Sequence, residues 1–380
     1  MTSIIDLDRL VADLNPDQIE TFNRVYRFTI SIGLEDIPES FIPKQLRWFG
    51  KKGETPEQTL ERVKKQKIVR VYNQYTFEGA SFNALRADRD IVGKGDPAIR
   101  EKVRAHIDGK IGDDFCTPFD YTASDVGILN GRVQGLHCIT ASNSAKYDGV
   151  SGMVTFNEHD PLKFGLEQLT DYIDVAQRWF KAIHSTRQEF VYPVIGWNCL
   201  EKAASTQVHG HMQLLLGKDF HYAEVEHLRK ASGDYRNEYG SDYFEDLIKI
   251  YDALGLSWHN GEATVMAELT PKKEKGITIV AHELSTDTLG AAYHVLRCFI
   301  DQMDVVSFNV AILMPPLEQR EGWENFPYIV RIVDREKITS ATSTINSAAD
   351  IGVMELFVNN IISSDPYKVI GGIKDYSKGN

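Results

Sequence analysis

One order of expected elements occurs twice in this chain, and this repeat restricts the possible folds more than any other feature. The first copy is a strand, a helix, a strand, a loop and a strand, at residues 149–157, 162–184, 190–198, 199–206 and 207–217. The second copy keeps the order, with strands at 275–284, 306–313 and 328–333 and a helix at 288–303. Such self-similarity indicates internal duplication. We therefore predict an α+β fold made of two tandem halves.

The region before the repeats, residues 1–81, is expected to form a helical N-terminal layer. Apolar residues recur at helical spacing in residues 16–32 and 56–67, and each segment opens with a proline, which favours a helix start. Prolines and glycines interrupt the chain between the two segments. This region carries no motif with recognisable chemistry.

The last strand of the first copy carries His209, His211 and Gln213, which alternate with apolar residues. Successive side chains of a strand point to opposite faces, so these three polar groups share one face. Burying each of them without a partner costs roughly 1–3 kcal/mol, so the strand requires partners or a ligand. A half-exposed strand explains the alternation equally well. The second copy lacks the histidine pair, which favours a functional role because the scaffold alone does not require histidines there.

Composition excludes several classes of function. The formal charge of −12 argues against non-specific binding of nucleic acid, whose phosphates attract basic surfaces. No stretch of 18 or more apolar residues occurs, so no membrane-spanning helix is expected. The four cysteines lie far apart without a C-x-x-C motif, which is typical of reduced thiols in a cytoplasmic protein. The sequence contains no Walker or dinucleotide-binding glycine motif.

Three further short segments and one asparagine are informative because of the order in which they occur along the chain. They are Arg86-Ala87-Asp88-Arg89, Asp113-Asp114-Phe115-Cys116, Asn157-Glu158-His159, and Asn198, which lies thirteen positions before His211. Together with the H-x-H-x-Q strand, they resemble the galactose-1-phosphate uridylyltransferase branch of the histidine-triad (HIT) superfamily, which also contains the diadenosine-tetraphosphate phosphorylases. The resemblance extends over about residues 82–335.

This resemblance implies a HIT-like fold of two halves, each an antiparallel sheet with a helix, at residues 82–235 and 236–380. It also implies covalent nucleotidyl transfer, in which His211 attacks the α-phosphorus of a nucleoside diphosphate compound. Imidazole suits this role because its ordinary pKa near 6.5 leaves it largely neutral and nucleophilic at pH 7. Gln213 is expected to donate its amide to a phosphate oxygen, and His209 accompanies the nucleophile in the same motif.

The resemblance also implies residues that hold the substrate's phosphates. Amide and hydroxyl groups would donate hydrogen bonds, and guanidinium groups would neutralise charge with bidentate geometry. The expected residues are Asn198, Ser205, Thr206, Arg86 and Arg89.

Many uridylyltransferases of this family bind a structural zinc ion, and the matching positions here are Asp113, Cys116, His159 and His209. Asp113 replaces a cysteine, and a set of one thiolate, one carboxylate and two imidazoles is acceptable to zinc. Related enzymes have lost the metal, so Cys116 as a plain buried thiol is the alternative. Gly210 and Met212 replace the family's usual proline and glycine, which is closer to the phosphorylase branch.

Three functional interpretations stay open at this stage. The first is a nucleotidyltransferase like the hexose-1-phosphate uridylyltransferases, which passes the nucleotidyl group to a phosphate-bearing acceptor. The second is a phosphorylase of dinucleoside polyphosphates or nucleotide sugars. The third is a non-enzymatic protein, either a jelly-roll metal binder with His209 and His211 as ligands or an inactive relative. No motif marks the base, the sugar or the acceptor, and a homodimer is expected only from the resemblance.

Overall fold

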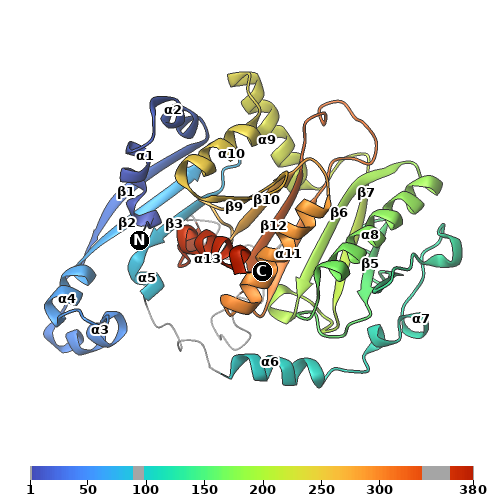
Figure 1. Ribbon diagram of the computed structural model, residues 1–380, viewed down its shortest axis with the longest axis horizontal. Coiled ribbons are helices and arrows are strands. Elements are labelled where there is room, and N and C mark those ends of the chain that lie inside the picture. Colours follow the sequence, from blue (N-terminus) through green and yellow to red (C-terminus); the bar gives the residue numbers. More distant parts are fainter. Residues whose placement is uncertain (1, 89–97, 336–359, 380) are drawn as a thin grey trace.

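The computed structural model describes residues 2–88, 98–335 and 360–379 of the chain (Figure 1). A nine-stranded sheet has the strand order β4-β5-β7-β6-β11-β12-β10-β9-β8, and all its neighbouring strands are antiparallel. Its strands are β4 (Cys138–Ser142), β5 (Ser151–Phe156), β6 (Phe190–Cys199), β7 (His211–Lys218), β8 (Ser257–Asn260), β9 (Ala263–Ala267), β10 (Ile277–Ala281), β11 (Phe308–Leu313) and β12 (Tyr328–Asp334). This is an α+β fold, as predicted.

The two expected halves lie side by side within this one sheet. Strands β4, β5, β7 and β6 form the first half, and β9, β10, β12 and β11 repeat the same order in mirror fashion. The halves meet where β6 pairs with β11, with Asn198 directly opposite Asn309. The predicted duplication is therefore present. Strand β7, which carries His211 and Gln213, lies between β5 and β6, and β6 is the strand at the junction of the two halves.

Helices α8 (Leu166–Thr186) and α11 (Thr286–Gln302) pack beside one another on the sheet, one from each half (Figure 1). The apolar stripe of α8 is buried, and Tyr172 stacks on Phe156 of β5 with ring centroids 3.8 Å apart. Gly152 makes room for the α8 indole, because a Cβ atom there would lie 2.7 Å from Trp179. This dense layer fixes the register of β5 and β7 from the side of the sheet that carries the helices.

The prediction of a purely helical N-terminal region was wrong. Residues 2–88 include helices and three strands that form a second sheet, with β13 (Asn360–Ile362) added in parallel to β3. The elements are η1 (Ile4–Asp6), α1 (Leu7–Ala12), α2 (Pro16–Val25), β1 (Tyr26–Leu34), η2 (Glu39–Phe41), α3 (Ile42–Phe49), α4 (Pro56–Lys64), β2 (Lys65–Asn73), β3 (Gly79–Asn83) and α5 (Ala84–Asp88).

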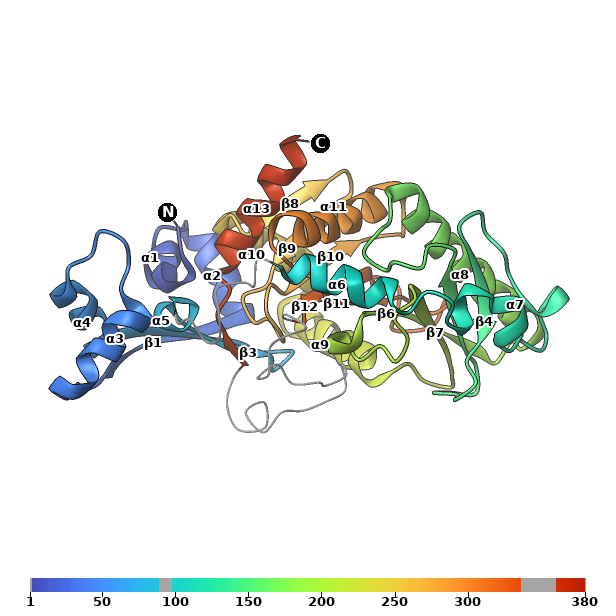
Figure 2. The ribbon, with the colours of Figure 1, turned by 90° about the horizontal axis from the view of Figure 1, so that it is seen from below.

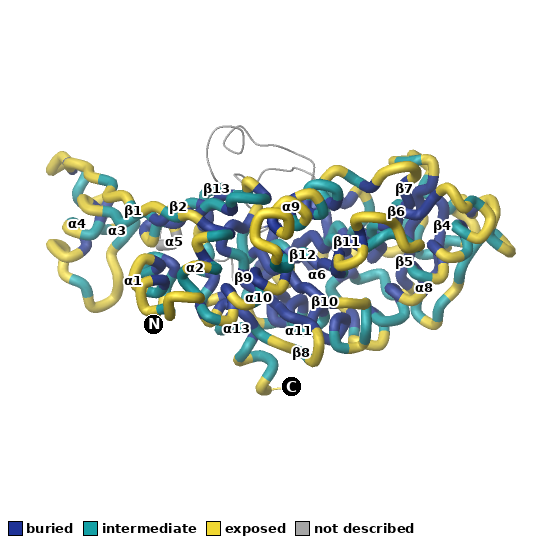
Figure 3. Tube along the Cα trace, turned by 90° about the horizontal axis from the view of Figure 1, so that it is seen from above, coloured by how far each residue is buried: buried dark blue, intermediate teal, exposed yellow. Residues whose placement is uncertain are grey.

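The reason is that two periods overlap in this sequence. The expected helix at 16–32 ends at Val25, because residues 26–32 alternate aromatic or β-branched residues with polar ones. The second expected helix begins at Pro56 and ends at Lys64, because residues 65–73 form β2, whose β-branched residues begin at Ile68. Figure 3 shows that this sheet extends away from the buried centre and that α3 and α4, at its tip, are largely exposed.

The remaining helices cover the edges and one face of the large sheet. They are α6 (Ile99–Asp108), η3 (Asp114–Cys116), α7 (Pro118–Tyr121), η4 (Leu129–Gly131), η5 (Glu201–Ala203), α9 (Ala223–Tyr239), α10 (Tyr243–Leu254) and α13 (Pro366–Gly379). Helix α6 runs across the ends of the strands on one side of the molecule (Figures 1 and 2). The expected boundary between residues 235 and 236 falls inside α9. In the described ranges, no helix combines the length and apolar character that crossing a membrane requires.

Candidate active site

His211 is the first residue of β7, and its imidazole is held in one tautomer. Its Nδ1 lies 2.9 Å from the carbonyl oxygen of His209, and because a carbonyl only accepts, Nδ1 carries the proton. The lone pair is therefore on Nε2, for which no hydrogen bond occurs among the described residues. The side chain is only 5% exposed, and this burial lowers the pKa of His211 below its ordinary value. The ring is neutral at pH 7, as a nucleophile requires.

Phe115 fixes the ring of His211 from a second direction. Its ring meets the imidazole edge to face, with centroids 5.1 Å apart. Phe115 follows Asp113 in a short turn, where the Asp113 carboxylate accepts the backbone N–H of Phe115. A capped turn thus holds an aromatic wall against the imidazole.

Gln213 lies two residues further along the same face of β7. Its Oε1 accepts a hydrogen bond from Nδ2 of Asn143 at 2.7 Å. Because the oxygen is occupied, the NH₂ group of Gln213 is the free end of the amide. Gln213 therefore presents donors on the face that carries the imidazole, as the sequence predicted.

Gly210, between the two histidines, is required by packing. A Cβ atom at this position would lie 2.3 Å from Cδ2 of Phe156, which is itself stacked on Tyr172. The backbone is also fixed, since Gly210 donates to the carbonyl of His159 and accepts from the N–H of Phe156. Proline, the family's usual residue here, would lack this N–H group and carry the excluded Cβ atom.

The loop before β7 brings together several predicted phosphate-binding residues. Leu200 and Ala204 both have positive φ angles, of 66° and 68°, which is strained backbone for residues with a side chain. Ser205 is buried, and its hydroxyl donates to the carbonyl of Gln207, so it shapes the loop. Thr206 is exposed beside it and keeps its hydroxyl available. Asn198 is the penultimate residue of β6, two residues after Gly196, which pairs with Gln213, so it lies on the face shared with Gln213.

Of the two predicted arginines, Arg86 is described, and it is not brought to this site. Arg86 is exposed in α5, which contacts β2, β3 and α3. Figure 1 places α5 by the N-terminal sheet, away from β7. Arg89 lies outside the described residues. The structure therefore does not support phosphate neutralisation by Arg86. For Arg89 this role stays a prediction.

The four predicted metal ligands converge beside the nucleophile. Nδ1 of His209 lies 3.1 Å from Nδ1 of His159, 3.4 Å from Sγ of Cys116 and 3.3 Å from Oδ1 of Asp113. All four ligand atoms lie within 4.8 Å of one another. The resemblance named these residues from three separate segments of the sequence, and the fold brings them together.

The hydrogen bonds of the two imidazoles fit a bound cation. Nε2 of His159 donates to the carbonyl of Ile107 at 3.0 Å, and Nε2 of His209 donates to that of Phe156 at 2.8 Å. Both Nδ1 atoms then carry lone pairs that face each other, and Oδ2 of Asp113 is buried without a hydrogen-bond partner. A metal ion would satisfy these groups together, and ligating histidines usually make such outer hydrogen bonds. The chemistry of this donor set fits zinc.

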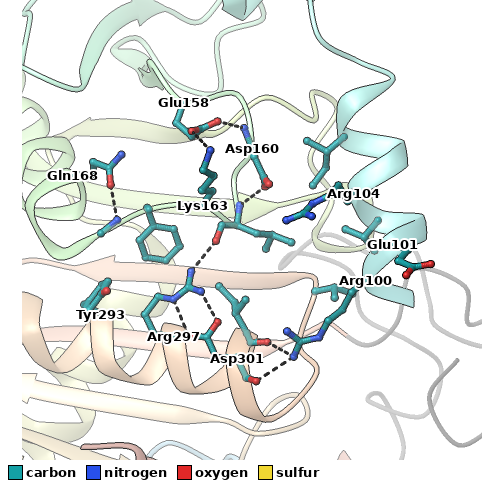
Figure 4. Close-up of a pocket in the computed structure, with 17 residues that line it drawn as sticks. Arg100, Glu101, Arg104, Glu158, Asp160, Lys163, Gln168, Tyr293, Arg297 and Asp301 are labelled. Carbon is teal, nitrogen blue, oxygen red and sulfur yellow. Dashed lines mark hydrogen bonds and ion pairs between the residues drawn. The ribbon is translucent and has the colours of Figure 1, made fainter. Parts of the chain in front are cut away.

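A separate cavity of about 780 Å³ lies behind the loop that carries His159, between α6, residues 158–165 and α11 (Figure 4). Three of its four basic side chains are already neutralised, because Arg100, Lys163 and Arg297 form ion pairs. None of the predicted catalytic or phosphate-binding residues lines it. We therefore do not place the reaction there.

Sequence reasoning missed three residues that contact the predicted ones, namely Phe115, Asn143 and Asn309. Phe115 lies inside a segment already singled out, so its place between Asp113 and Cys116 was a usable signal. Asn143 and Asn309 gave none, because each reaches the site only through strand pairing, by way of β4 and β11.

Several solved structures are similar to this chain in fold. An ADP-glucose phosphorylase from Arabidopsis thaliana, solved with bound ADP-glucose, matches with a TM-score of 0.58 and 14% identity, covering 80% of this chain and 97% of that one. A GalT-like protein from the same plant matches with a TM-score of 0.54 and 15% identity, covering 70% and 92%.

A uridylyltransferase matches with a TM-score of 0.51 and 14% identity, covering 65% of this chain and 86% of that one. No protein-family model matches the sequence, and no curated protein matches it. At these identities the likeness establishes the fold. The likeness in fold to a GalT-like protein, a uridylyltransferase and an ADP-glucose phosphorylase agrees with the predicted resemblance.

Proposed function

We propose that this protein is a nucleotidyltransferase that forms a covalent nucleotidyl intermediate on His211. One observation carries the proposal: a buried imidazole, locked with its proton on Nδ1, has Nε2 without a partner in the described chain, and Gln213 presents amide donors on the same face. The similar solved structures include a uridylyltransferase and a phosphorylase of ADP-glucose, which supports this class of chemistry.

In the proposed first step, Nε2 of His211 attacks the α-phosphorus of a nucleoside diphosphate compound. A P–N bond forms, the bond from the α-phosphorus to the bridging oxygen breaks, and that oxygen leaves on the second phosphate with the electron pair. In the second step, a phosphate oxygen of the acceptor attacks the same phosphorus and releases the imidazole. The acceptor is a sugar 1-phosphate in a transferase and orthophosphate in a phosphorylase.

The surrounding residues act on the phosphate oxygens and on the ring. The free NH₂ groups of Gln213 and Asn198 would donate to non-bridging oxygens, where negative charge grows in the transition state. The carbonyl of His209 holds the Nδ1 proton and stabilises the charged ring of the intermediate. Phe115 limits rotation of the imidazole, so that Nε2 keeps its direction of attack.

We further propose that Asp113, Cys116, His159 and His209 hold a structural zinc ion. When bound, it would neutralise the thiolate and the carboxylate and tie the turn of Phe115 to the start of β7. Elemental analysis of the purified protein tests this directly. We expect one zinc per chain, reduced in Cys116→Ala; a wild-type protein without stoichiometric metal would reject the zinc site and leave the buried-thiol interpretation.

The phosphorylase alternative has a specific observation in its favour. Phe156 leaves no space for a Cβ atom at Gly210, so packing excludes the proline that the transferase motif usually has at this position. A glycine here is closer to the phosphorylase branch. The jelly-roll alternative is wrong, because α8 and α11 pack on the sheet. The two histidines also do not face one common metal position. His209 belongs to the cluster with Asp113, Cys116 and His159, whereas Nδ1 of His211 donates to a backbone carbonyl.

The test is to incubate the protein with UDP-glucose, ADP-glucose or diadenosine tetraphosphate labelled at the α-phosphorus. We expect an acid-labile, alkali-stable protein label that is absent in His211→Asn. Adding glucose 1-phosphate or orthophosphate should discharge the label and distinguish transferase from phosphorylase. A wild-type protein that stays unlabelled with all three donors would reject the proposal.

Two further expectations accompany this function. The four cysteines are free, which favours a reducing compartment such as the cytoplasm. Dimerisation is carried over from the resemblance alone, and light scattering of the purified chain would decide it.

A further inference from the structure

We infer that Asn309, in the half without the histidine pair, is a positioning residue that orients Asn198 for the reaction. The inference rests on the proposed function, because Asn198 is one of its two amide donors. Asn309 is not marked by any motif. Its role follows from where the two halves of the sheet meet.

The strand register places Asn309 in one row with the nucleophile. Thr155 pairs with His211, and Asn198 pairs with Asn309, both in antiparallel register. Gly196 pairs with Gln213 between them, and continuing that register by two residues brings Asn198 opposite His211. Side chains of directly paired residues point to the same face. The row therefore crosses four neighbouring strands, and β11 is the strand contributed by the second half.

The hydrogen bonds fix which way each amide points. Nδ2 of Asn309 donates to the carbonyl oxygen of Ala203 at 3.0 Å and to Oδ1 of Asn198 at 2.6 Å. The Ala203 carbonyl only accepts, so the atom of Asn309 beside it must be the nitrogen. The Asn198 atom that faces this nitrogen must then be oxygen. The NH₂ group of Asn198 is left over, and in the described chain it makes no hydrogen bond.

Asn309 makes this arrangement at a cost to the folded state. Its side chain is 7% exposed, and its own Oδ1 is buried without a hydrogen-bond partner in the described chain. An unpaired buried acceptor is unfavourable, and this cost offsets part of what the two hydrogen bonds donated by Nδ2 contribute. Asn198 in the first half and Asn309 in the second are both asparagines with different roles. Asn198 donates to the substrate, and Asn309 orients Asn198.

The experiment measures single-turnover labelling of His211 with α-phosphorus-labelled ADP-glucose or UDP-glucose at saturating donor. We expect Asn309→Val to slow the rate about 10- to 100-fold, as loss of orientation does, without lowering the amount finally labelled. The unfolding midpoint is measured alongside to confirm that the variant is folded at the assay temperature, since the change removes the unpaired oxygen but also leaves the Ala203 carbonyl without this donor. Ser307→Ala is the matched control: it deletes a hydroxyl that donates to the carbonyl of Cys199, from the chain just before β11, and its labelling rate should be that of the wild type.

A double-mutant cycle shows whether Asn309 acts through Asn198. Adding Asn309→Val to Asn198→Ala should slow labelling by less than about threefold further. The inference would be overturned if the double variant were slowed by the product of the two single effects, or if Asn309→Val kept the wild-type labelling rate. Crystal structures of the wild type and Asn309→Val give a readout without activity: the Asn198 amide should turn or lose its fixed orientation in the variant. If no donor labels the wild type, the proposed function fails, and an unchanged Asn198 amide in the variant would separately reject the inference.

Discussion

Replacing Gly210 with alanine tests how far packing against Phe156 controls the site. The added Cβ atom would lie 2.3 Å from Cδ2 of Phe156, about 1.1 Å inside ordinary van der Waals contact at 3.4 Å. Phe156 cannot retreat, because Tyr172 stacks on its other face at 3.8 Å between centroids. The backbone of residue 210 cannot retreat without breaking its hydrogen bonds to His159 and Phe156.

Overpacking of this kind costs typically about 1–3 kcal/mol of the free energy of unfolding. The strand start should also shift by a distance of the order of the overlap, and a displacement of about 1 Å at a nucleophile costs about 100-fold in rate. Urea unfolding and the rate of His211 labelling measure the two effects. Gly233→Ala is the control, since a Cβ atom at this helical position meets no atom within 4 Å. A Gly210→Ala variant with wild-type stability and rate would refute the packing argument.

Three further predictions follow from single contacts. Asn143→Ala should slow labelling of His211 about 10-fold, because the Gln213 amide loses the partner of its oxygen, and unchanged kinetics would contradict this. Chelation of bound zinc, or the change Cys116→Ala, should lower the melting temperature. Cys138 is a buried thiol outside the cluster, so Cys138→Ala should keep its metal. Equal loss of zinc from both variants would contradict the assignment. Burial lowers the pKa of His221 to about 4, so the neutral ring stabilises the fold fully above its unfolded pKa near 6.5. This contribution, about 3 kcal/mol, is lost as the pH falls from 6.5 towards 4, and His221→Gln should flatten that part of the urea-midpoint profile.

Several features of the fold and the site could be read from residue patterns because they depend on local rules. Alternation and helical spacing located β5, α8, β6 and β7 and their second copies. The H-x-H-x-Q spacing placed His211 and Gln213 on one strand face, since the side-chain period of a strand is fixed at two, whereas His209 precedes β7 and belongs to the metal-ligand cluster. The four cluster residues were named as a group from the resemblance, and the fold brings their ligand atoms within 4.8 Å of one another.

The N-terminal sheet shows where such rules fail. Residues 16–32 satisfy a helical period at first and a strand period later, and pairing with β2 decides the point of change at Tyr26. Arg86 illustrates a different failure, because a motif gives a residue type in sequence order and does not say on which side of the molecule its helix lies.

By itself, the sequence determined the duplicated strand and helix order, the shared strand face of His211 and Gln213, and the loss of the histidines in the second copy. Only the tertiary structure decided that the halves join through β6 and β11, and that Asn309 and Asn143 orient the two amides of the site. The physical reason is range: periodicity and turn chemistry act between near neighbours in the chain, whereas strand pairing and hydrogen bonds between distant segments form only when the whole core is packed.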